Sequence, residues 1–165
     1  MPFSPSRLQE KHDEPGVGFT KYILKKPVVS CVEAAQAKGI PLKNELKTLI
    51  LKTCLGYLAL HLPGDATASL RKVKKILKVK QASLAAPENL QRLGMKPGTV
   101  SAIINPTWSM PHLVSVKLFA MNYLSTNSGS TRHYYIFSPL VFLTADKVLF
   151  GEFEQEINIQ YSCVS

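Results

Sequence analysis

Two apolar runs of strand length stand close together near the middle of the chain, and they restrict the possible folds more than any other feature. Residues 46–53 read LKTLILKT and residues 57–62 read YLALHL, with only Cys54, Leu55 and Gly56 between them. Runs that are apolar on both faces are typical of strands covered on both sides, and a short connection containing glycine favours a hairpin. The sequence therefore predicts a hairpin of two buried strands.

Strands and short helices are mixed along the rest of the chain. Further strands are predicted at residues 19–24, 81–84, 113–118, 122–126 and 134–137. Helices are predicted at residues 31–38, 70–78, 87–93 and 139–146. This uneven order of elements indicates an α/β (α+β) sheet domain.

The helix at residues 31–38 has the best-defined ends. Ser30 and Glu33 have the spacing of a capping box, in which the serine hydroxyl accepts from the third helical amide. Gly39 follows the last helical residue and is suited to the left-handed conformation that ends many helices. We therefore expect this helix to begin after Ser30 and to end at Gly39.

The length and composition fit one globular domain. The chain has 165 residues, of which 45% are hydrophobic, and this is enough to bury a core without a metal or a disulfide. Residues 1–18 contain three prolines and two glycines without any periodicity. We expect a flexible tail at residues 1–18, one domain at residues 19–150 and a C-terminal extension at residues 151–165.

The cysteines and the apolar runs indicate the compartment. Cys31, Cys54 and Cys163 are an odd number with no CxxC spacing, so neither a disulfide framework nor a zinc site is predicted. No apolar stretch approaches the roughly 20 residues of a membrane span, and residues 1–18 lack the apolar run of a secretory signal. We expect a soluble cytoplasmic protein with no membrane partner.

A basic stripe dominates the net charge of +9. Residues 71–80 carry six basic side chains and no acidic one, while apolar residues recur there at helical spacing. The outward-facing members are Arg71, Lys72, Lys74, Lys75 and Lys78. Such a stripe is typical of a surface that binds a polyanion such as tRNA, because neutralised phosphates release counterions. A merely solvated helix face is the alternative.

Lys47 lies within the first strand of the hairpin, where a charge is costly to bury. Strand alternation places it on the same face as Leu49 and Leu51. A buried ammonium needs a partner or a ligand. The alternatives are that Lys47 pairs with Glu45 or extends to solvent at the start of the strand.

Two polar segments are further candidates for a binding site. Residues 96–106 read KPGTVSAIINP, and glycine there lets successive loop amides point into a cavity. Residues 125–130 read STNSGS, where a strand should end, and they are suited to the rim of a pocket. An ordinary connecting loop and a hairpin turn are the alternatives.

The other constellations are weak. The four histidines lack metal-ligand spacing, and His61 is interpreted as a satisfied core residue within an apolar strand. Cys54 has no histidine near it in sequence, so a thiol nucleophile is not favoured. No Walker loop or dinucleotide fingerprint occurs, and neither a metal nor a cofactor is predicted.

Taken together and in this order, the segments resemble the YbaK/prolyl-tRNA synthetase-associated editing domains over residues 19–146. The matching segments are Glu33-Ala34-Ala35 with Gly39, Lys47-Thr48-Leu49-Ile50, Pro63-Gly64-Asp65, the basic helix, Ala86-Pro87-Glu88, Gly98-Thr99-Val100-Ser101 and Ser138-Pro139. The resemblance implies a mixed central sheet flanked by short helices. It also implies a deacylase that removes small amino acids from mischarged tRNA.

The resemblance assigns roles to particular residues. Lys47 matches the family's functional lysine, and Thr48 lies next to it. The loop that cradles the aminoacyl ester corresponds to Gly98, Thr99, Val100, Ser101 and Ala102. Ala102 stands where the family has proline, so a fixed φ angle is absent from this loop. Asn127 and Ser128 fall in a segment that lines the pocket in relatives.

Two hypotheses follow for the function. The first is a trans-editing deacylase that binds the acceptor end of aminoacyl-tRNA, with an aminoacyl-tRNA synthetase as a further expected partner. Backbone donors, a positioned water and the neighbouring ribose hydroxyl suffice for hydrolysis of an activated ester, so no metal or cofactor is needed. The second is a non-catalytic module that binds tRNA or a synthetase. Retention of Lys47 favours the first and Ala102 favours the second.

Overall fold

The computed structural model describes residues 19–156. The tail predicted at residues 1–18 lies outside the described residues, as do residues 157–165. Within residues 19–156 the chain forms two sheets and a few short helices, which confirms the predicted mixed fold. None of the helices in this part of the chain is long and apolar enough to cross a membrane.

The larger sheet has five strands in the order β4-β2-β3-β5-β8. They are β2 (Leu46–Thr53), β3 (Gly56–Pro63), β4 (Ala82–Leu84), β5 (His112–Ser115) and β8 (Val148–Gly151). The predicted hairpin is confirmed, because β2 and β3 pair antiparallel along their whole length. β5 runs parallel to both β3 and β8, so the sheet is mixed.

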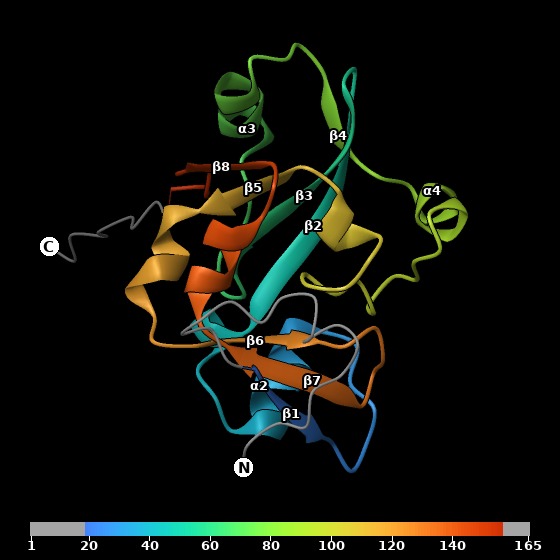
Figure 1. Cartoon of the computed structure of the whole chain (residues 1–165), viewed down its shortest axis with the longest axis vertical. Coiled ribbons are helices and arrows are strands. Elements are labelled where there is room, and N and C mark those ends of the chain that lie inside the picture. Colours follow the sequence, from blue (N-terminus) through green and yellow to red (C-terminus); the bar gives the residue numbers. More distant parts are fainter. Residues whose placement is uncertain (1–18, 157–165) are drawn as a thin grey trace, which may run out of the picture.

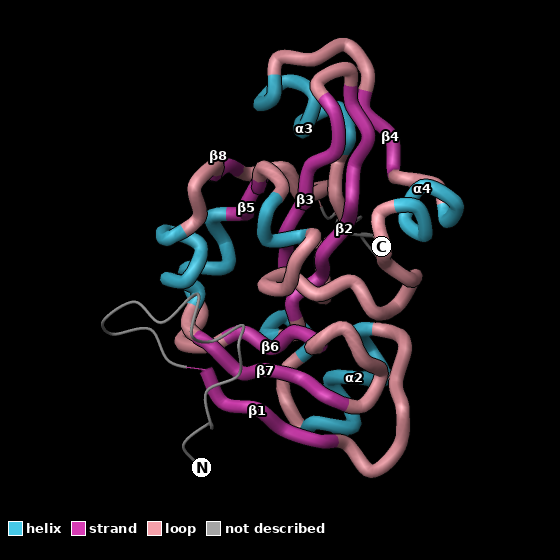
Figure 2. The backbone as a smooth tube through the Cα atoms, turned by 45° about the vertical axis from the view of Figure 1, so that its right-hand side comes forward, coloured by secondary structure: helices cyan, strands magenta, loops and turns pink. Residues whose placement is uncertain are grey.

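The smaller sheet is antiparallel, with the order β1-β7-β6. It consists of β1 (Phe19–Ile23), β6 (Leu124–Asn127) and β7 (His133–Phe137). Figures 1 and 2 show this sheet in the lower part of the molecule, beside α2, with the five-stranded sheet above it. An isolated parallel bridge between Glu45 and Ser125 joins the start of β2 to β6.

Three α-helices pack around the sheets within the described residues. They are α2 (Cys31–Lys38), α3 (Leu70–Leu77) and α4 (Pro87–Arg92). The cap predicted for α2 is confirmed, since the Ser30 hydroxyl accepts from Glu33 N at 3.1 Å and Gly39 adopts a φ of 68°. Glu33 reaches back to the amide of Val29, one residue before the position that a capping box predicts.

Two predicted elements differ from the structure. The strand predicted at residues 113–118 ends at Ser115, because the Ser115 hydroxyl accepts from Lys117 N and starts a 3₁₀ turn, η3 (Val116–Ala120). The helix predicted at residues 139–146 is a 3₁₀ helix, η4 (Pro139–Thr144). Its tighter turns, closed by bonds such as Ala145 N to Phe142 O, suit so short a segment. Two further 3₁₀ turns are η1 (Leu42–Asn44) and η2 (Thr107–Ser109).

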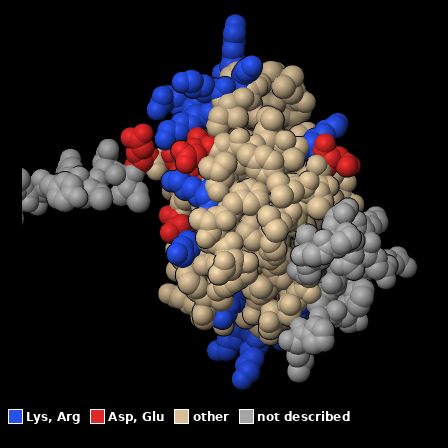
Figure 3. All heavy atoms as spheres, turned by 60° about the vertical axis from the view of Figure 1, so that its left-hand side comes forward, with Lys and Arg blue, Asp and Glu red and all other residues tan. Residues whose placement is uncertain are grey.

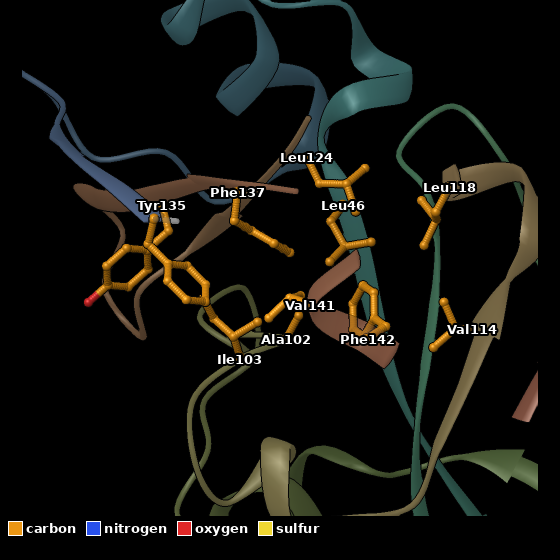
Figure 4. Close-up of a cluster of buried hydrophobic side chains, with 11 residues drawn as sticks. Leu46, Ala102, Ile103, Val114, Leu118, Leu124, Tyr135, Phe137, Val141 and Phe142 are labelled. Atoms are coloured by element: carbon orange, nitrogen blue, oxygen red, sulfur yellow. The ribbon is translucent and has the colours of Figure 1, made fainter. Parts of the chain in front are cut away.

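The main core lies between the two sheets. Figure 4 shows Phe137 of the smaller sheet and Val114 of the larger sheet directed toward the same space, with Phe142 of η4 between them. Leu46 from the start of β2 belongs to the same cluster. This shared core fixes the position of one sheet against the other.

Two smaller clusters cover the faces of the five-stranded sheet. Leu51 of β2 packs with Val73 of α3 in one cluster. The next residue along the strand, Ile50, packs with Met95 and with Leu90 of α4 in the other. Because neighbouring side chains of a strand point to opposite faces, α3 and α4 cover opposite faces of the sheet.

The packing continues past the domain boundary expected at residue 150. Phe153 is fully buried, and its carbonyl accepts from Ser69 N at 2.7 Å. Glu154 is also buried and accepts a hydrogen bond from the Ser115 hydroxyl. Residues 151–156 are therefore part of the domain, and they hold the start of α3 against the sheet.

Candidate active site

A cavity of about 390 Å³ lies between the two sheets. It is lined by α2, the first half of β2, the connection from β4 to α4, the loop at residues 97–100 and residues 127–134. β4 pairs only with residues 51–53 of β2, so this side of residues 46–50 has no partner strand in the described part of the chain. The open edge of β2 forms one wall of the cavity, whose size is typical of small-molecule sites.

Lys47 lines this cavity from β2. Its Nζ donates to the carbonyl oxygen of Ala66 at 2.5 Å, which uses one of its three N–H donors. Within residues 19–156 it forms no ion pair, and the expected alternative partner Glu45 binds Lys38 instead. Lys47 therefore lines the cavity with an ammonium that has no carboxylate partner within the described residues.

The loop predicted to cradle a ligand reaches the cavity through two of its residues. Gly98 and Val100 line the cavity, and Gly98 has a φ of 79° that favours glycine. The amides of Gly98 and Val100 donate to no acceptor within the described residues. Thr99 N donates to Lys96 O at 3.1 Å, so its amide closes the turn instead.

The structure does not bring the last two loop residues to the cavity. The Ser101 hydroxyl donates to Asn127 O at 2.6 Å, and Ser101 is buried. Ala102 is fully buried in the main core, and its amide donates to Thr126 Oγ1 at 3.4 Å. Ala102, which the resemblance aligns with a proline, thus contacts the core and does not line the cavity.

Asn127 joins the two loops that border the cavity. Its Nδ2 donates to Val100 O at 3.0 Å, and its Oδ1 accepts from Gly129 N at 2.8 Å. Asn127 also lines the cavity. The neighbouring Ser128 does not, because both its amide and its hydroxyl bind His133 O. The predicted polar rim therefore acts mainly through Asn127.

A buried ion pair that the sequence analysis missed lies at the end of the cavity nearest α2. Lys38 Nζ donates to both carboxylate oxygens of Glu45 at 2.8 Å and to Ser125 Oγ at 2.8 Å. The two side chains are only 2% and 6% exposed. Lys38 Nζ also lies 4.2 Å from the centre of the Tyr134 ring, a cation–π contact.

Burial shifts the acid–base properties of this pair. Desolvation lowers the pKa of Lys38 and raises the pKa of Glu45, and the mutual attraction of the two charges opposes both shifts. Burial also raises the pKa of the neighbouring Cys31 thiol, and Glu45 raises it further. The thiol is therefore held in its neutral form, which does not favour a nucleophilic role.

Thr48 lines the cavity from the opposite face of β2 to Lys47. Its Oγ1 lies 3.0 Å from Nδ1 of His61, which is fully buried beneath it. The interpretation of His61 as a satisfied core residue is confirmed, since its Nε2 also lies 2.8 Å from His112 Nδ1. The sequence alone did not indicate this link between the cavity wall and two buried histidines.

The predicted basic stripe lies away from the cavity. α3 packs on the face of the large sheet opposite to α4 and the loop at residues 97–100. Arg71, Lys75 and Lys78 are exposed, whereas Lys72 donates to Glu154 O at 3.0 Å and lies 3.7 Å from Glu156. Lys74 is half-buried. Figure 3 shows basic side chains gathered over this end of the molecule, with acidic side chains beside them.

Four other basic residues stand next to the cavity. Lys25, Lys26, Lys96 and Arg132 are exposed and lie within two residues of cavity-lining residues in the sequence. Arg132 Nε donates to Leu24 O at 3.0 Å, which holds it next to a residue that lines the cavity. These residues are scattered along the chain, so no run of charge in the sequence indicated them.

The described residues contain no cluster of histidine, cysteine and acidic side chains that could hold a metal ion. The polar groups that line the cavity are instead Lys47, the paired Lys38 and Glu45, the Cys31 thiol, the His133 imidazole, hydroxyls and the Asn127 carboxamide. These groups can bind a carbonyl, an ammonium or a ribose by hydrogen bonds.

The comparison with known families matches these observations. The family model described as the aminoacyl-tRNA editing domain matches residues 25–144. The chain belongs to this family. The matched range includes every cavity-lining residue except Leu24, and an editing role is therefore assigned to the domain.

Solved structures share the fold of this editing domain. The hypothetical protein APE2540 is 21% identical, with a TM-score of 0.78 over 89% of this chain and 96% of that chain. A chain described as a proposed trans-editing enzyme for prolyl tRNA synthetase is 18% identical, with a TM-score of 0.76 over 93% of this chain and 100% of that chain. No curated protein matches the sequence.

We predict that Lys38→Met destabilises the editing domain strongly at pH 8. The change leaves the Glu45 carboxylate buried without its cation, which costs about 3–5 kcal/mol in comparable cases. Without Lys38 the pKa of Glu45 rises further above its ordinary value. A carboxyl group whose pKa is raised in the folded state stabilises the fold at low pH, where it is protonated. This stabilisation is lost as the pH rises through the folded-state pKa. Urea unfolding at pH 5 and pH 8 measures the effect.

The matched control is Lys43→Met, because Lys43 is exposed and forms no ion pair in the described part of the chain. The double variant Lys38→Met/Glu45→Gln removes both charges and should recover part of the lost stability. If Lys38→Met has the same small effect as the control at both pH values, the ion pair does not hold this end of the cavity.

Proposed function

We propose that the protein is a trans-editing deacylase that hydrolyses the ester of tRNA mischarged with a small amino acid. One observation carries the proposal: Lys47, Gly98 and Val100 line the same cavity of an aminoacyl-tRNA editing domain, and the amides of Gly98 and Val100 donate to no acceptor within the described residues. A cation and two N–H donors that have no acceptor within the described residues suit a carbonyl oxygen that gains negative charge during hydrolysis.

In the proposed reaction a water molecule attacks the ester carbonyl carbon. The carbonyl oxygen becomes an oxyanion, which the Gly98 and Val100 amides stabilise by hydrogen bonds. The bond to the ribose oxygen then breaks, and a proton derived from the water passes to that oxygen with help from the neighbouring ribose hydroxyl. The products are a free amino acid and tRNA with a free 3′ end.

Lys47 binds and orients the substrate in this proposal. Ala66 O occupies one of its N–H groups and fixes the ammonium, while the other two remain for the ligand. Asn127 keeps the loop that carries Val100 in place by its bonds to Val100 O and Gly129 N. Preorganised groups of this kind need no rearrangement when the reaction begins.

The size of the cavity supports a small amino acid. About 390 Å³ is near the lower end of the range for ligand pockets, and the aminoacyl group must share this space with part of the terminal ribose. The apolar wall residues Leu49, Ile50 and Leu90 further suit a short uncharged side chain. Alanine, cysteine, serine and threonine are candidates of this size.

The tRNA is proposed to contact two basic regions. Lys25, Lys26, Lys96 and Arg132 beside the cavity suit the phosphates of the 3′ end. The exposed residues Arg71, Lys75 and Lys78 of α3 lie on the other side of the large sheet and suit phosphates further along the acceptor stem. Because exposed lysines and arginines release counterions on binding, both contacts should depend on salt.

We predict that Lys47→Ala keeps the fold and lowers the single-turnover rate of deacylation about tenfold to a hundredfold. The change removes a charge-assisted hydrogen bond, which is worth about 1.5–3 kcal/mol. The matched control is Lys52→Ala, since Lys52 lies on the same strand but is exposed and away from the cavity. A panel of mischarged tRNAs provides the substrates.

A Lys47→Ala variant as active as the Lys52→Ala control would remove Lys47 from the site. If the parent protein binds tRNA tightly but hydrolyses no member of the panel, the deacylase proposal is wrong. A non-catalytic tRNA-binding module would then account for the fold.

We predict a different effect when Arg71, Lys75 and Lys78 are all replaced by glutamine. Each lost phosphate contact should reduce the slope of log K against log salt concentration by about 0.7–0.9. The deacylation rate at saturating tRNA should stay at the parent value, because no residue of α3 lines the cavity. Binding titrations at several salt concentrations measure the slope. An unchanged slope would identify the stripe as a solvated helix face.

A further inference from the structure

We infer that His61 and His112 fix the hydroxyl of Thr48 as a hydrogen-bond acceptor, so that this wall of the cavity selects a ligand that donates. The ligand group is proposed to be the α-ammonium of the aminoacyl substrate, and this part of the inference rests on the proposed function. The two histidines are positioning residues, because neither lines the cavity.

The contacts run from Thr48 through His61 and His112 to the carbonyl oxygen of Trp108, and this last group sets the direction of each hydrogen bond. Trp108 O, a carbonyl oxygen, can only accept, and it lies 3.0 Å from His112 Nε2. Nε2 of His112 must therefore carry the proton. In a neutral imidazole the other nitrogen is then an acceptor, so His112 Nδ1 accepts from the group 2.8 Å away, which is His61 Nε2.

The same reasoning continues to the cavity wall. With its proton on Nε2, neutral His61 has an acceptor at Nδ1, and Thr48 Oγ1 lies 3.0 Å from it. The Thr48 hydroxyl must donate its single proton there. The Thr48 hydroxyl then has only its lone pairs left, which can only accept, and Thr48 lines the cavity.

The surroundings of the two rings support their neutral state. His61 is fully buried, His112 is 3% exposed, and the ring of Phe142 lies 4.7 Å from that of His61, centre to centre. Burial lowers the pKa of both histidines, and His112 lowers that of His61 further. The ring of Trp108 lies 5.1 Å from that of His112. Two neutral rings in such a setting keep one arrangement of protons.

An acceptor at this position suits the α-ammonium for two reasons. Every aminoacyl ester carries this group, so one fixed acceptor serves every substrate of the enzyme. Thr48 and Lys47 point to opposite faces of β2, which separates the acceptor from the cation that is proposed to bind the ester. A hydroxyl that were free to rotate would instead accept or donate equally well.

The arrangement of protons can be measured without any substrate. Long-range ¹H–¹⁵N spectra of the full chain at neutral pH distinguish the two neutral tautomers of histidine from imidazolium. We expect His61 and His112 both to carry their proton on Nε2. A proton on Nδ1 of either ring, or an imidazolium, would overturn the inference.

The selection of a donor is tested with two probes, 3′-deoxy-3′-(L-alanylamino)adenosine and its propionylamino counterpart, which lacks the ammonium. The parent should bind the alanyl probe more tightly than the propionyl probe. Valine is close to threonine in shape but has no acceptor. Thr48→Val should therefore lower the affinity for the alanyl probe about tenfold to a hundredfold and leave the affinity for the propionyl probe unchanged. Thr48→Ser should restore most of the preference.

A third variant tests the positioning role. His112→Phe frees His61 to adopt either tautomer, so the preference for the alanyl probe should fall although Thr48 is intact. If His112→Phe does not fold, the two Thr48 variants and the spectra still decide the question. The inference is overturned if Thr48→Val keeps the parent's preference, if it weakens both probes equally, or if the parent has no preference. A probe that carries serine in place of alanine gives a further outcome. If Thr48→Val lowers the affinity for this seryl probe alone, Thr48 contacts the substrate side chain and the inference is overturned.

Failure of the proposed function gives a different pattern. In that case the parent hydrolyses no mischarged tRNA, while the tautomers and the preference for the alanyl probe persist. Conversely, hydrolysis that is unaffected by Thr48→Val overturns this inference and leaves the deacylase proposal in place.

Discussion

The ion pair between Lys38 and Glu45 holds together the parts of the molecule that form the cavity. Lys38 is the last residue of α2, Glu45 directly precedes β2, and Ser125 on β6 completes the set of acceptors around the ammonium. One helix and one strand end from each sheet thus meet at one desolvated charge. Burying two charges is costly, so such a pair is kept only where all its hydrogen bonds are made. Here Lys38 makes three, and the backbone bridge from Glu45 to Ser125 lies at the same place.

The cavity follows from this junction and from the short β4. Because β4 pairs only with the end of β2, the start of β2 has an open edge toward the smaller sheet. A strand edge presents groups on both of its faces, so Lys47 and Thr48 reach the same cavity although their side chains point in opposite directions. Asn127 completes the wall by joining Val100 to Gly129. The site therefore lies where the edge of β2 is not paired with β4.

The sequence was sufficient for features that depend on neighbouring residues. The hairpin and the cap of α2 are set within a few residues, and each was predicted correctly. The end of α4 was predicted to within one residue. Lys47 was identified because a charged residue within an apolar strand is visible in the sequence itself. Gly98 was identified because glycine within a polar loop permits a close backbone approach.

Features that depend on distant residues were not predictable in the same way. Ser125 lies 87 positions from Lys38, and His112 lies 51 positions from His61, so no local pattern indicates either contact. The burial of Phe153 depends on Ser69 and on β5, which the C-terminal sequence does not reveal. The basic stripe was visible as a run, but its position across the sheet from the cavity required the packing of Val73 against Leu51.

The central claim is that the aminoacyl end of tRNA binds between the two sheets, against the amides of Gly98 and Val100. Backbone ¹H–¹⁵N chemical shifts of the full chain, recorded while the alanylamino adenosine probe is added, test this claim directly. The account predicts that the largest changes occur at Gly98, Val100 and Thr48, with residues 70–78 unaffected. Changes confined to α3, or none at the loop residues at saturating probe, would contradict it.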